Sequence, residues 1–434
     1  MTLSKDFSMR IQMTKKRPIL RSLVRFLFFA LWVLTAWGIP VTTKAEAAKN
    51  VIVMIPDGCS FEQYTLARWY KGSPLAMDTI LAGAVKTYTA DSVVADSAPA
   101  ASAYATGVRT SDKFISVAPK TEGMLHSLKI SGYEPYQPLA TVLEAAKLTG
   151  RAVGVVSTSR VTHATPVISD LLIFDEAVRI ALDFAGLKGD TLLLVMPDHN
   201  TGGMSIGNWA TSQNYFQMKP DDLVGPLKKM KASSFLLSKK LQGDSTPDRV
   251  IDIIRSYWGL NITSEDAQKI LEKMAEYPKD PYYAFGEVLS PKYLYIGWST
   301  HGHCGGDVPL GAFGPNRPSG LLDAPEIAQV VAEALQVDLE AMTHRLLVDA
   351  SAEFGTGNVM IDSSDPDNSV IRITHGEKVF LLPANKNLIK SDDRVYPLEG
   401  VTILIPETQK AYIPRQAVEK IKGIRAVVTQ IGRR

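Results

Sequence analysis

The sequence predicts a three-layer α/β/α fold with a largely parallel central sheet, followed by a small β-rich C-terminal region. Short apolar runs, such as residues 51–55 and 191–196, have the composition of strands buried on both faces. Helical patterns separate these runs along the chain. After about residue 337 the pattern changes to closely spaced strand-like segments. We therefore expect a main domain over residues 48–337 and a second region over residues 338–434.

The first 47 residues have the pattern of a secretory signal peptide. A basic part precedes an apolar stretch at residues 26–39 and a small-x-small sequence at residues 45–47. The apolar stretch is too short to cross a bilayer comfortably, but its two tryptophans leave an uncleaved membrane anchor as the alternative. We expect cleavage near Ala48 and a periplasmic or extracellular protein, with no membrane attachment after cleavage.

The remaining composition is that of an ordinary globular protein. Residues 48–434 carry 39 Lys and Arg against 43 Asp and Glu, a net charge of −4. No basic surface for nucleic acid is indicated, so we expect none as a partner. The chain has two cysteines, Cys59 and Cys304, for which a disulfide and free thiols both stay open.

A helix is predicted to begin at Ser97. Asp96 and Ser97 precede a run of small residues that ends at Gly107, which suits the left-handed conformation that closes a helix. Free backbone N–H groups and the positive end of the dipole collect at a helix N-terminus, which suits a phosphate. The alternative is that Asp96 or Ser97 is only an N-cap.

The other elements follow from apolar periodicity. Residues 205–290 are rich in helix formers and are predicted to be a helical insertion packed over the sheet. A helix at residues 173–184 is predicted, with an apolar side that comprises Ala177, Ile180, Ala181 and Phe184. Further helices are predicted at residues 61–70, 139–148, 223–241, 264–277 and 324–335, and further strands at 152–157, 293–298, 358–361, 370–373, 378–382 and 401–405.

Carboxylates and imidazoles follow the predicted strands, in loops rich in Gly, Thr or Pro. They are Asp57, His163, Asp198, His199, His301 and His303. Open α/β sheets place ligands at the C-terminal ends of their strands, and such a mixture is typical of a zinc or mixed zinc and magnesium site. Taken alone, Asp57 is better explained as a turn residue before a glycine.

Ser97 completes this expected site as a nucleophile. A serine hydroxyl is a poor nucleophile at neutral pH unless a base or a metal activates it. The sequence shows no Ser-His-Asp pattern, and Ser97 lacks the flanking glycines of a nucleophile elbow. We therefore expect activation by one metal ion, while a second stabilises the leaving oxygen of a phosphoryl displacement.

Five motifs in order make the sequence resemble the alkaline phosphatase family. The motifs are Ile55-Pro56-Asp57-Gly58, Asp96-Ser97-Ala98 through Thr106-Gly107-Val108, His163-Ala164-Thr165-Pro166, Asp198-His199-Asn200-Thr201-Gly202-Gly203-Met204 and Gly302-His303-Cys304-Gly305-Gly306-Asp307-Val308-Pro309. The resemblance implies Zn²⁺ and Mg²⁺ as cofactors and a phosphoserine intermediate at Ser97.

The resemblance also implies a role for each matching residue. Ser97 and Asp57 would bind one zinc ion, and Asp57 would bridge it to the magnesium ion. Asp198 and His199 would be further ligands of that zinc, and His303 would be a ligand of the other zinc. Thr165 would be a magnesium ligand. His163 and Asp96 would lie near the metal ligands without binding a metal themselves.

The sequence departs from the family after Pro166, where a long block of the family sequence is missing. With it go a magnesium-binding glutamate, two protein ligands of one zinc ion and a phosphate-binding arginine. The residues available to replace them are Asp170, Asp175, Glu176, His301 and Cys304. We expect the deletion to uncover core side chains and to impair the site.

We therefore expect an exported, metal-dependent phosphate monoester hydrolase that acts on small phosphorylated substrates through a phosphoserine, with a homodimer as a further expectation. Two alternatives stay open. The first is a catalytically inactive relic of the same fold that binds metal or phosphate. The second is a related phosphodiesterase or sulfatase-like hydrolase.

Overall fold

The computed structural model describes residues 47–125, 132–157, 164–243 and 245–423. The expected signal peptide and His163 lie outside these residues. No helix among the described residues is long and apolar enough to cross a membrane.

A five-stranded sheet forms the centre of the main domain, with the strand order β1-β3-β8-β2-β9. β1 (Asn50–Met54) pairs in parallel with β3 (Thr191–Val195), and β2 (Leu81–Lys86) pairs in parallel with β9 (Gly320–Asp323). β8 (Val308–Phe313) lies between β3 and β2 and is antiparallel to both. All strands except β8 therefore point the same way, as a largely parallel sheet requires.

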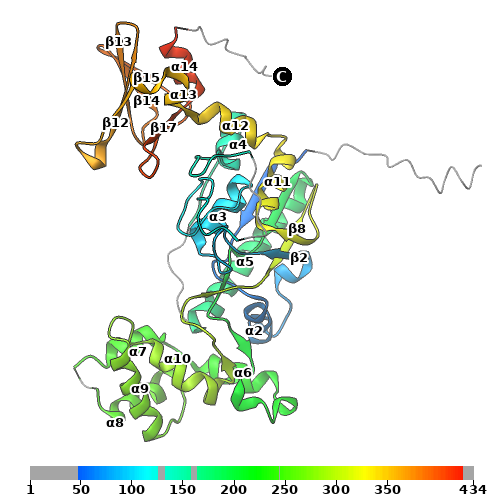
Figure 1. The fold of residues 1–434 in the computed structure, drawn as a ribbon. Helices are drawn as coiled ribbons and strands as arrows, with labels where there is room; N and C mark the ends of the chain where they lie inside the picture. The colour runs from blue at the N-terminus through cyan, green and yellow to red at the C-terminus, as the bar shows by residue number, and fades with distance from the viewer. Residues whose placement is uncertain (1–46, 126–131, 158–163, 244, 424–434) are drawn as a thin grey trace, which may run out of the picture. The chain divides into compact units, whose positions relative to one another are not determined.

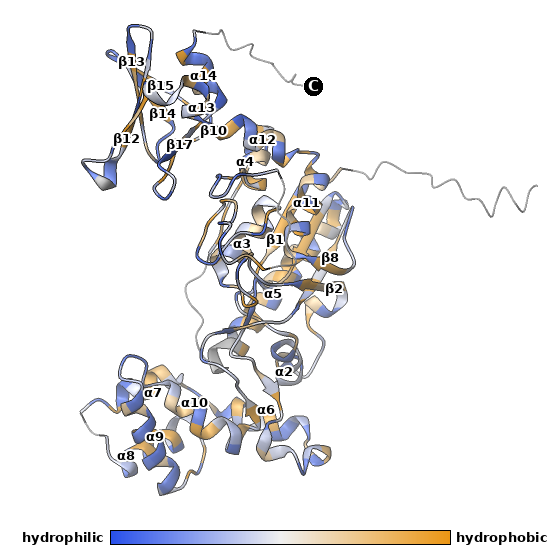
Figure 2. Ribbon diagram, viewed as in Figure 1, coloured by the Kyte–Doolittle hydropathy of each residue, from blue (hydrophilic) through white to orange (hydrophobic). Residues whose placement is uncertain are grey.

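Helices cover both faces of the sheet and make three layers (Figure 1). On one face, α3 (Ser97–Thr106), α4 (Val142–Leu148) and α11 (Ala324–Leu335) contribute to the same apolar core as β3 and β8. On the other face, α2 (Phe61–Lys71) and α5 (Ala164–Lys188) pack against Leu193 and Val195 of β3. The apolar character of α11 and β8 is visible in Figure 2. The predicted fold class is confirmed.

Two segments predicted to be buried strands are not buried. β1 is an edge strand that pairs only with β3, and Val53 is 40% exposed. Residues 152–157 have no regular structure, and Val155 and Val156 are exposed. A strand needs a neighbouring strand to satisfy its backbone groups, and no described strand pairs with this segment. These exposures agree with the expected effect of the missing block.

α5 corrects the prediction for its apolar side. The helix is longer than predicted, and it buries Leu171, Val178 and Ala185 against the sheet. Ile180 and Phe184, which were expected to face the core, are instead mostly exposed. The error arises because α5 is apolar on two opposite sides, and periodicity alone does not identify the side that meets the sheet.

Most of the insertion forms a core of its own, but its first helix packs beside Leu66 of α2 and Ile168 of α5. Its buried residues, which include Ile254, Ile270 and Phe285, make one cluster among themselves. The helices are α6 (Pro220–Lys229), α7 (Ser234–Lys240), α8 (Pro247–Trp258), α9 (Ser264–Glu276) and α10 (Tyr283–Leu289).

Two further predictions within or beside the insertion are wrong. The helix predicted at residues 223–241 is broken, because Ser233 caps the start of α7. Of the strand predicted at residues 293–298, only β6 (Ile296–Gly297) pairs, with β5 (Ser205–Ile206), because a π-helical turn occupies Ser290–Leu294.

The C-terminal region is rich in strands, as predicted. A five-stranded antiparallel sheet comprises β11 (Val359–Asp362), β12 (Val370–His375), β13 (Lys378–Pro383), β14 (Leu388–Ser391) and β15 (Arg394–Pro397). A smaller sheet comprises β10 (Val348–Asp349), β17 (Lys410–Ile413) and β16 (Ile403–Ile405). Helices α12 (Leu339–Leu346), α13 (Ala350–Phe354) and α14 (Arg415–Ile421) complete the region.

Candidate active site

The turns after β1 and β3 meet through a glycine. The backbone N–H of Gly58 donates a hydrogen bond to Asp198 Oδ1 at 2.9 Å. Gly58 has a φ of +66°, and a Cβ atom there would lie 2.2 Å from Thr201 Oγ1. Only a glycine therefore fits, and its close approach holds Asp57 beside Asp198 and His199.

His199 presents its Nε2 atom to the site. The imidazole is fully buried, and its Nδ1 lies 3.2 Å from the carbonyl oxygen of Asn200. Because a carbonyl oxygen only accepts, the tautomer of the neutral imidazole that fits this contact carries its proton on Nδ1 and a lone pair on Nε2. Nε2 lies 3.4 Å from Asp198 Oδ2 and 3.7 Å from Asp57 Oδ1.

Ser97 is the first residue of α3, and its hydroxyl reaches this cluster. Its Oγ lies 3.0 Å from His199 Nε2, and Asp96 caps the helix by accepting a hydrogen bond from Ser97 N at 2.7 Å. Gly107 closes α3 in the left-handed conformation, as predicted. The carboxylates lie near Nε2 and not near Nδ1, so this arrangement does not have the geometry of a Ser-His-Asp triad.

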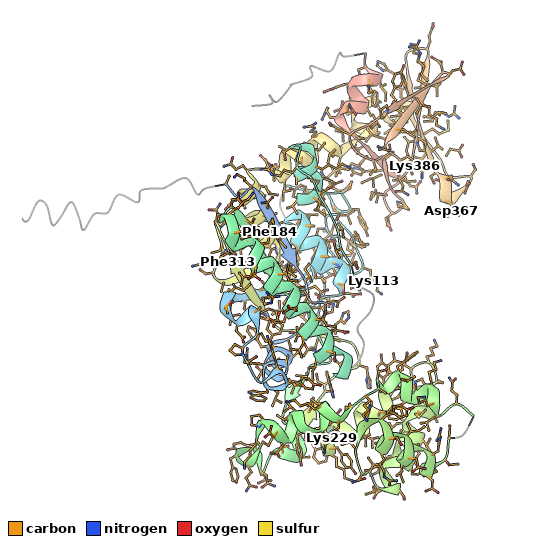
Figure 3. The ribbon with its side chains drawn as sticks, turned by 180° about the vertical axis from the view of Figure 1, so that it is seen from behind. Lys113, Phe184, Lys229, Phe313, Asp367 and Lys386 are labelled. Atoms are coloured by element: carbon orange, nitrogen blue, oxygen red, sulfur yellow. The ribbon has the colours of Figure 1, made fainter. Side chains whose placement is uncertain are left out.

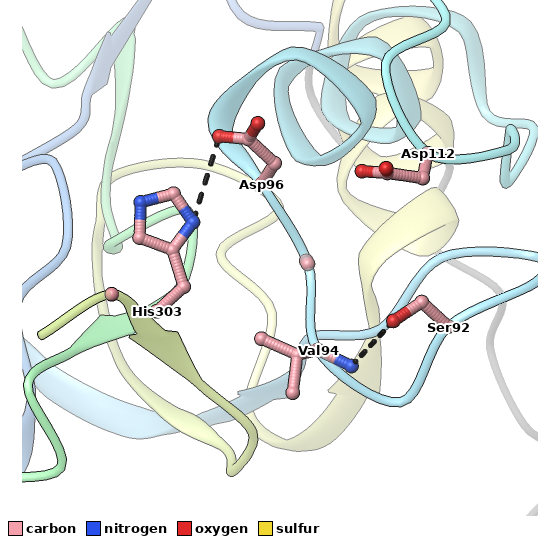
Figure 4. A pocket seen from close by; sticks show the side chains of 7 residues that line it. Ser92, Val94, Asp96, Asp112 and His303 are labelled. Carbon is pink, nitrogen blue, oxygen red and sulfur yellow. Dashed lines mark hydrogen bonds and ion pairs between the residues drawn. The ribbon is translucent and has the colours of Figure 1, made fainter. Parts of the chain in front are cut away.

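His303 lies in a short strand. β7 (His303–Cys304) pairs antiparallel with β4 (Asn200–Thr201), which places Thr201 opposite His303. The rings of His199 and His303 stack with their centroids 3.8 Å apart. His303 Nδ1 also lies 3.5 Å from Asp96 Oδ1, an ion pair drawn in Figure 4.

Two overlapping groups of side chains could hold a metal ion. The first contains Asp57, Asp198 and His199, and the second contains Asp96, His199 and His303. In each group the potential ligand atoms lie within 4.8 Å of one another. Carboxylate oxygens and an imidazole nitrogen are suitable ligands for zinc.

The electrostatics of the first group favour a cation. Partial desolvation and the nearby Asp198 carboxylate raise the pKa of Asp57, and the neighbouring imidazoles oppose this shift. Two carboxylates this close repel each other when both are ionised. A bound divalent cation would remove that repulsion.

A cavity of about 370 Å³ opens beside Asp96 and His303 (Figure 4). Asp96 and Asp112 both belong to its wall. The lining residues are Ser92, Val94, Ala95, Asp96, Asp112, Gly302 and His303. None of these residues is Lys or Arg, so this wall offers no side-chain cation to a phosphate.

The model of the alkaline phosphatase family matches this chain over residues 48–170 and 167–337. The chain belongs to the alkaline phosphatase family.

Curated relatives and a solved structure agree with this assignment. Alkaline phosphatase 3 of Bacillus subtilis is 28% identical over 180 residues, which cover 40% of this chain and 36% of that protein. Streptomycin-6-phosphate phosphatase of Streptomyces griseus is 32% identical over 187 residues, which cover 41% of this chain and 36% of that protein. The matched part therefore spans little more than a third of the length of these two relatives.

The alkaline phosphatase of Thermus thermophilus has a similar fold, with a TM-score of 0.54 at 19% sequence identity. The match covers 69% of this chain and 94% of that one.

The structure brings together five of the residues that the family resemblance singled out. They are Asp57, Ser97, Asp198, His199 and His303. Asp96, expected behind the ligands, contacts His303 directly. Sequence reasoning missed this pairing because it depends on the register of β4 with β7, and it also missed Asp112. Thr165 lies in the first turn of α5, and the structure does not describe its side chain.

The proposed substitutes for the missing ligands are engaged elsewhere or lie outside both groups. Buried Asp175 binds Lys71 Nζ at 2.9 Å and Met77 N at 3.2 Å, and Glu176 pairs with Arg179. His301 Nε2 lies 2.6 Å from Glu287 Oε1 in α10. Asp170 and Cys304 belong to neither group of potential metal ligands among the described residues. Cys59 and Cys304 are free thiols, which decides between the two alternatives that the sequence left open.

Proposed function

We propose that this chain is a metal-dependent phosphate monoester hydrolase that uses Ser97 as its nucleophile. The observation that carries the proposal is the position of the Ser97 hydroxyl. It lies 3.0 Å from Nε2 of His199, a member of the group of Asp57, Asp198 and His199. Membership of the alkaline phosphatase family supports the same reaction.

Asp57, Asp198 and His199 would hold one zinc ion, and Ser97 would complete its ligands. When bound, zinc lowers the pKa of the serine hydroxyl and favours its attack on phosphorus. Asn200 keeps the proton of His199 on Nδ1, so that Nε2 stays available. The N-terminus of α3 directs the positive end of its dipole toward the phosphate. The bond between Oγ and phosphorus forms as the bond between phosphorus and the ester oxygen breaks, and the ester oxygen leaves as the alcohol with the proton that the serine gave up. Water then attacks phosphorus, the Oγ–phosphorus bond breaks, and phosphate leaves as the serine regains a proton.

The same residues support only a weak second metal site. His199 has one free nitrogen and can give it to one ion, which leaves Asp96 and His303 for another. Asp57 is the one expected magnesium ligand whose side chain the structure describes. The cavity wall also lacks Lys and Arg. Because loss of one preorganised donor typically costs about a hundred- to a thousand-fold in rate, we expect slow turnover.

Two of the earlier alternatives can be separated by a panel of substrates. An inactive relic would bind zinc or phosphate without turnover, and a sulfatase-like or phosphodiesterase-like enzyme would prefer other esters. The relative from Streptomyces griseus bears the name of a phosphatase that acts on a phosphorylated small molecule. That similarity supports small phosphate monoesters as the substrate class for this chain.

We also propose that the chain is exported and processed near Ala48, because residues 1–47 have the pattern of a signal peptide. Intact-mass measurement of the protein recovered outside the cytoplasm tests this proposal. A mass that includes the first 47 residues would support the membrane anchor instead.

The direct test of the reaction is the Ser97→Ala variant of the full chain. With zinc and magnesium added, we expect slow hydrolysis of p-nitrophenyl phosphate by the wild-type chain and none by the variant. Ser212→Ala, in an exposed part of the insertion, is the matched control and should keep wild-type turnover. Equal turnover by Ser97→Ala and the wild type would refute the role of Ser97.

A further inference from the structure

Glu287 lies where the insertion contacts the segment that leads to His303. It belongs to α10, and its Oε1 atom lies 2.6 Å from His301 Nε2. Because a carboxylate only accepts, the tautomer of the neutral His301 imidazole that fits this contact donates its proton through Nε2. Figure 3 shows the insertion with its side chains, where Lys229 marks the end of α6. A side chain of the insertion therefore binds a residue two positions before a candidate metal ligand.

Several neighbours hold this contact in place. Tyr277 Oη donates a hydrogen bond to the same Glu287 Oε1 at 2.6 Å, and Lys273 Nζ lies 3.5 Å from Glu287 Oε2. The ring of Tyr283 stacks on the His301 imidazole, with the two centroids 4.3 Å apart. An isolated ion pair at the surface contributes little, but here a hydrogen-bond network and a stacked ring act on one imidazole. The insertion therefore fixes the position of His301.

The loop formed by residues 299–302 also packs on a turn of the candidate site. Gly202 N donates a hydrogen bond to Gly302 O at 2.8 Å, and Ser299 N donates one to Gly202 O at 2.9 Å. Directly after the loop, His303 enters β7, which pairs with β4. The loop is thus held by the insertion on one side and by the turn after β4 on the other.

We propose that Glu287 is a positioning residue for the second group of potential metal ligands. It acts through His301 and so holds His303 in place beside Asp96, whose Oδ1 lies 3.5 Å from His303 Nδ1. The proposal rests on the proposed function, because this group is the weaker of its two metal sites. It assigns a role to the insertion, which would determine how strongly the second ion binds.

The expected effect is on the affinity of the second ion. Outer residues that orient a metal ligand are typically worth about 10- to 100-fold in metal affinity, because the ion then finds its donors already in place. His303 belongs to the second group and not to the first, so a displaced loop weakens the second ion and spares the first. Glu287 lies outside the apolar core of the insertion, which includes Ile254, Ile270 and Phe285. Its replacement should therefore leave that core intact.

Zinc titration of the full chain, followed by native mass spectrometry, tests the proposal. We expect Glu287→Ala to raise the dissociation constant of the weaker zinc ion ~10-fold or more and to leave that of the tighter ion unchanged. Glu287→Gln keeps an acceptor for His301 Nε2 and should restore the affinity to within about 3-fold of the wild type. Glu276→Ala is the matched control, since Glu276 also pairs with Lys273. That variant should bind both zinc ions like the wild type.

A double-mutant cycle tests whether Glu287 acts through His301. In the His301→Ala background, Glu287→Ala should cause no further loss of affinity for the weaker zinc ion. Ile270→Ala separates positioning from stability, because it removes buried side-chain atoms from the core of the insertion. It should lower the free energy of unfolding and leave both zinc affinities unchanged.

Four results would overturn the proposal. They are an unchanged weaker affinity in Glu287→Ala, additive losses in the cycle, an equal loss of affinity in Ile270→Ala, and a wild type that binds a single zinc ion even at millimolar zinc. In the last case His303 would hold no second ion. None of these measurements requires turnover, so a failure of the proposed reaction, which Ser97→Ala reveals, is distinguishable from a failure of this proposal.

Discussion

The backbone conformation of Gly58 helps to determine the geometry of the candidate site. Its positive φ and its contact with Thr201 exclude a side chain. We expect Gly58→Ala to lower the free energy of unfolding by about 2–4 kcal/mol, from left-handed strain plus a close contact. Urea denaturation measures the change.

The Gly72→Ala variant separates the effect of left-handed backbone strain from the effect of a close contact by the added Cβ atom. Gly72 has a φ of +75°, and nothing lies within 4 Å of the Cβ position. We expect this variant to lose only about 1–2 kcal/mol and to keep the zinc affinity of the wild type. Equal losses at both positions would show that the turn at Gly58 does not need its close approach.

Asp57 is the exposed ligand of the proposed zinc site. We expect Asp57→Asn to weaken zinc binding at least ~100-fold, since even residues behind metal ligands are worth 10- to 100-fold. Isothermal titration with zinc measures this. Asp112→Asn, a carboxylate change outside both groups of potential ligands, is the control and should bind zinc like the wild type.

Residue-level prediction succeeded where a local pattern positions a side chain. Ser97 starts a helix because Asp96 caps it, and Asp198 and His199 follow a buried strand. The contact between Asp96 and His303 could not be foreseen, because it depends on the pairing of β4 with β7. The local sequence around Asp96 or His303 does not indicate that β4 and β7 pair.

At the scale of elements, hydrogen bonds to the Asp266 carboxylate connect α9 with the segment that follows α10. Its carboxylate accepts hydrogen bonds from Thr263 Oγ1 at 2.8 Å, Lys292 Nζ at 3.0 Å and Tyr293 Oη at 2.5 Å. Burial alone would raise the pKa of Asp266, but these hydrogen bonds prevail and hold it well below its usual range.

This carboxylate makes the stability of the insertion depend on pH. A lowered pKa in the folded state stabilises the fold above the unfolded-state value of about 4, and the contribution is lost as the pH falls below it. We expect Asp266→Asn to lower the free energy of unfolding by about 1–3 kcal/mol at pH 7. Circular dichroism should also show a smaller loss of helicity in the variant as the pH is lowered. Exposed Glu265→Gln is the control, with little change expected; an unchanged acid profile in Asp266→Asn would contradict this account.

Element prediction succeeded where the pattern determines the environment and failed where a distant partner does. α11 begins and ends at the predicted residues, and β3 lies where a buried strand was expected. Residues 152–157 have an equally apolar pattern but no strand beside them, so they stay irregular. α8 was missed, although Thr246 and Pro247 are a recognisable helix start.

At the scale of the whole molecule, the chain has a largely parallel five-stranded sheet and two overlapping groups of potential metal ligands. The first group is the proposed zinc site, and the second group shares His199 with it. The two proposed metal sites are therefore expected to differ in affinity.

Zinc titration of the purified full chain, followed by native mass spectrometry, tests the central claim most directly. We expect one zinc ion per chain to bind tightly and a second to bind at least ~100-fold more weakly, because Asp96 and His303 alone provide two donors. Two zinc ions of equal affinity per chain, retained together after exchange into metal-free buffer, would contradict the account.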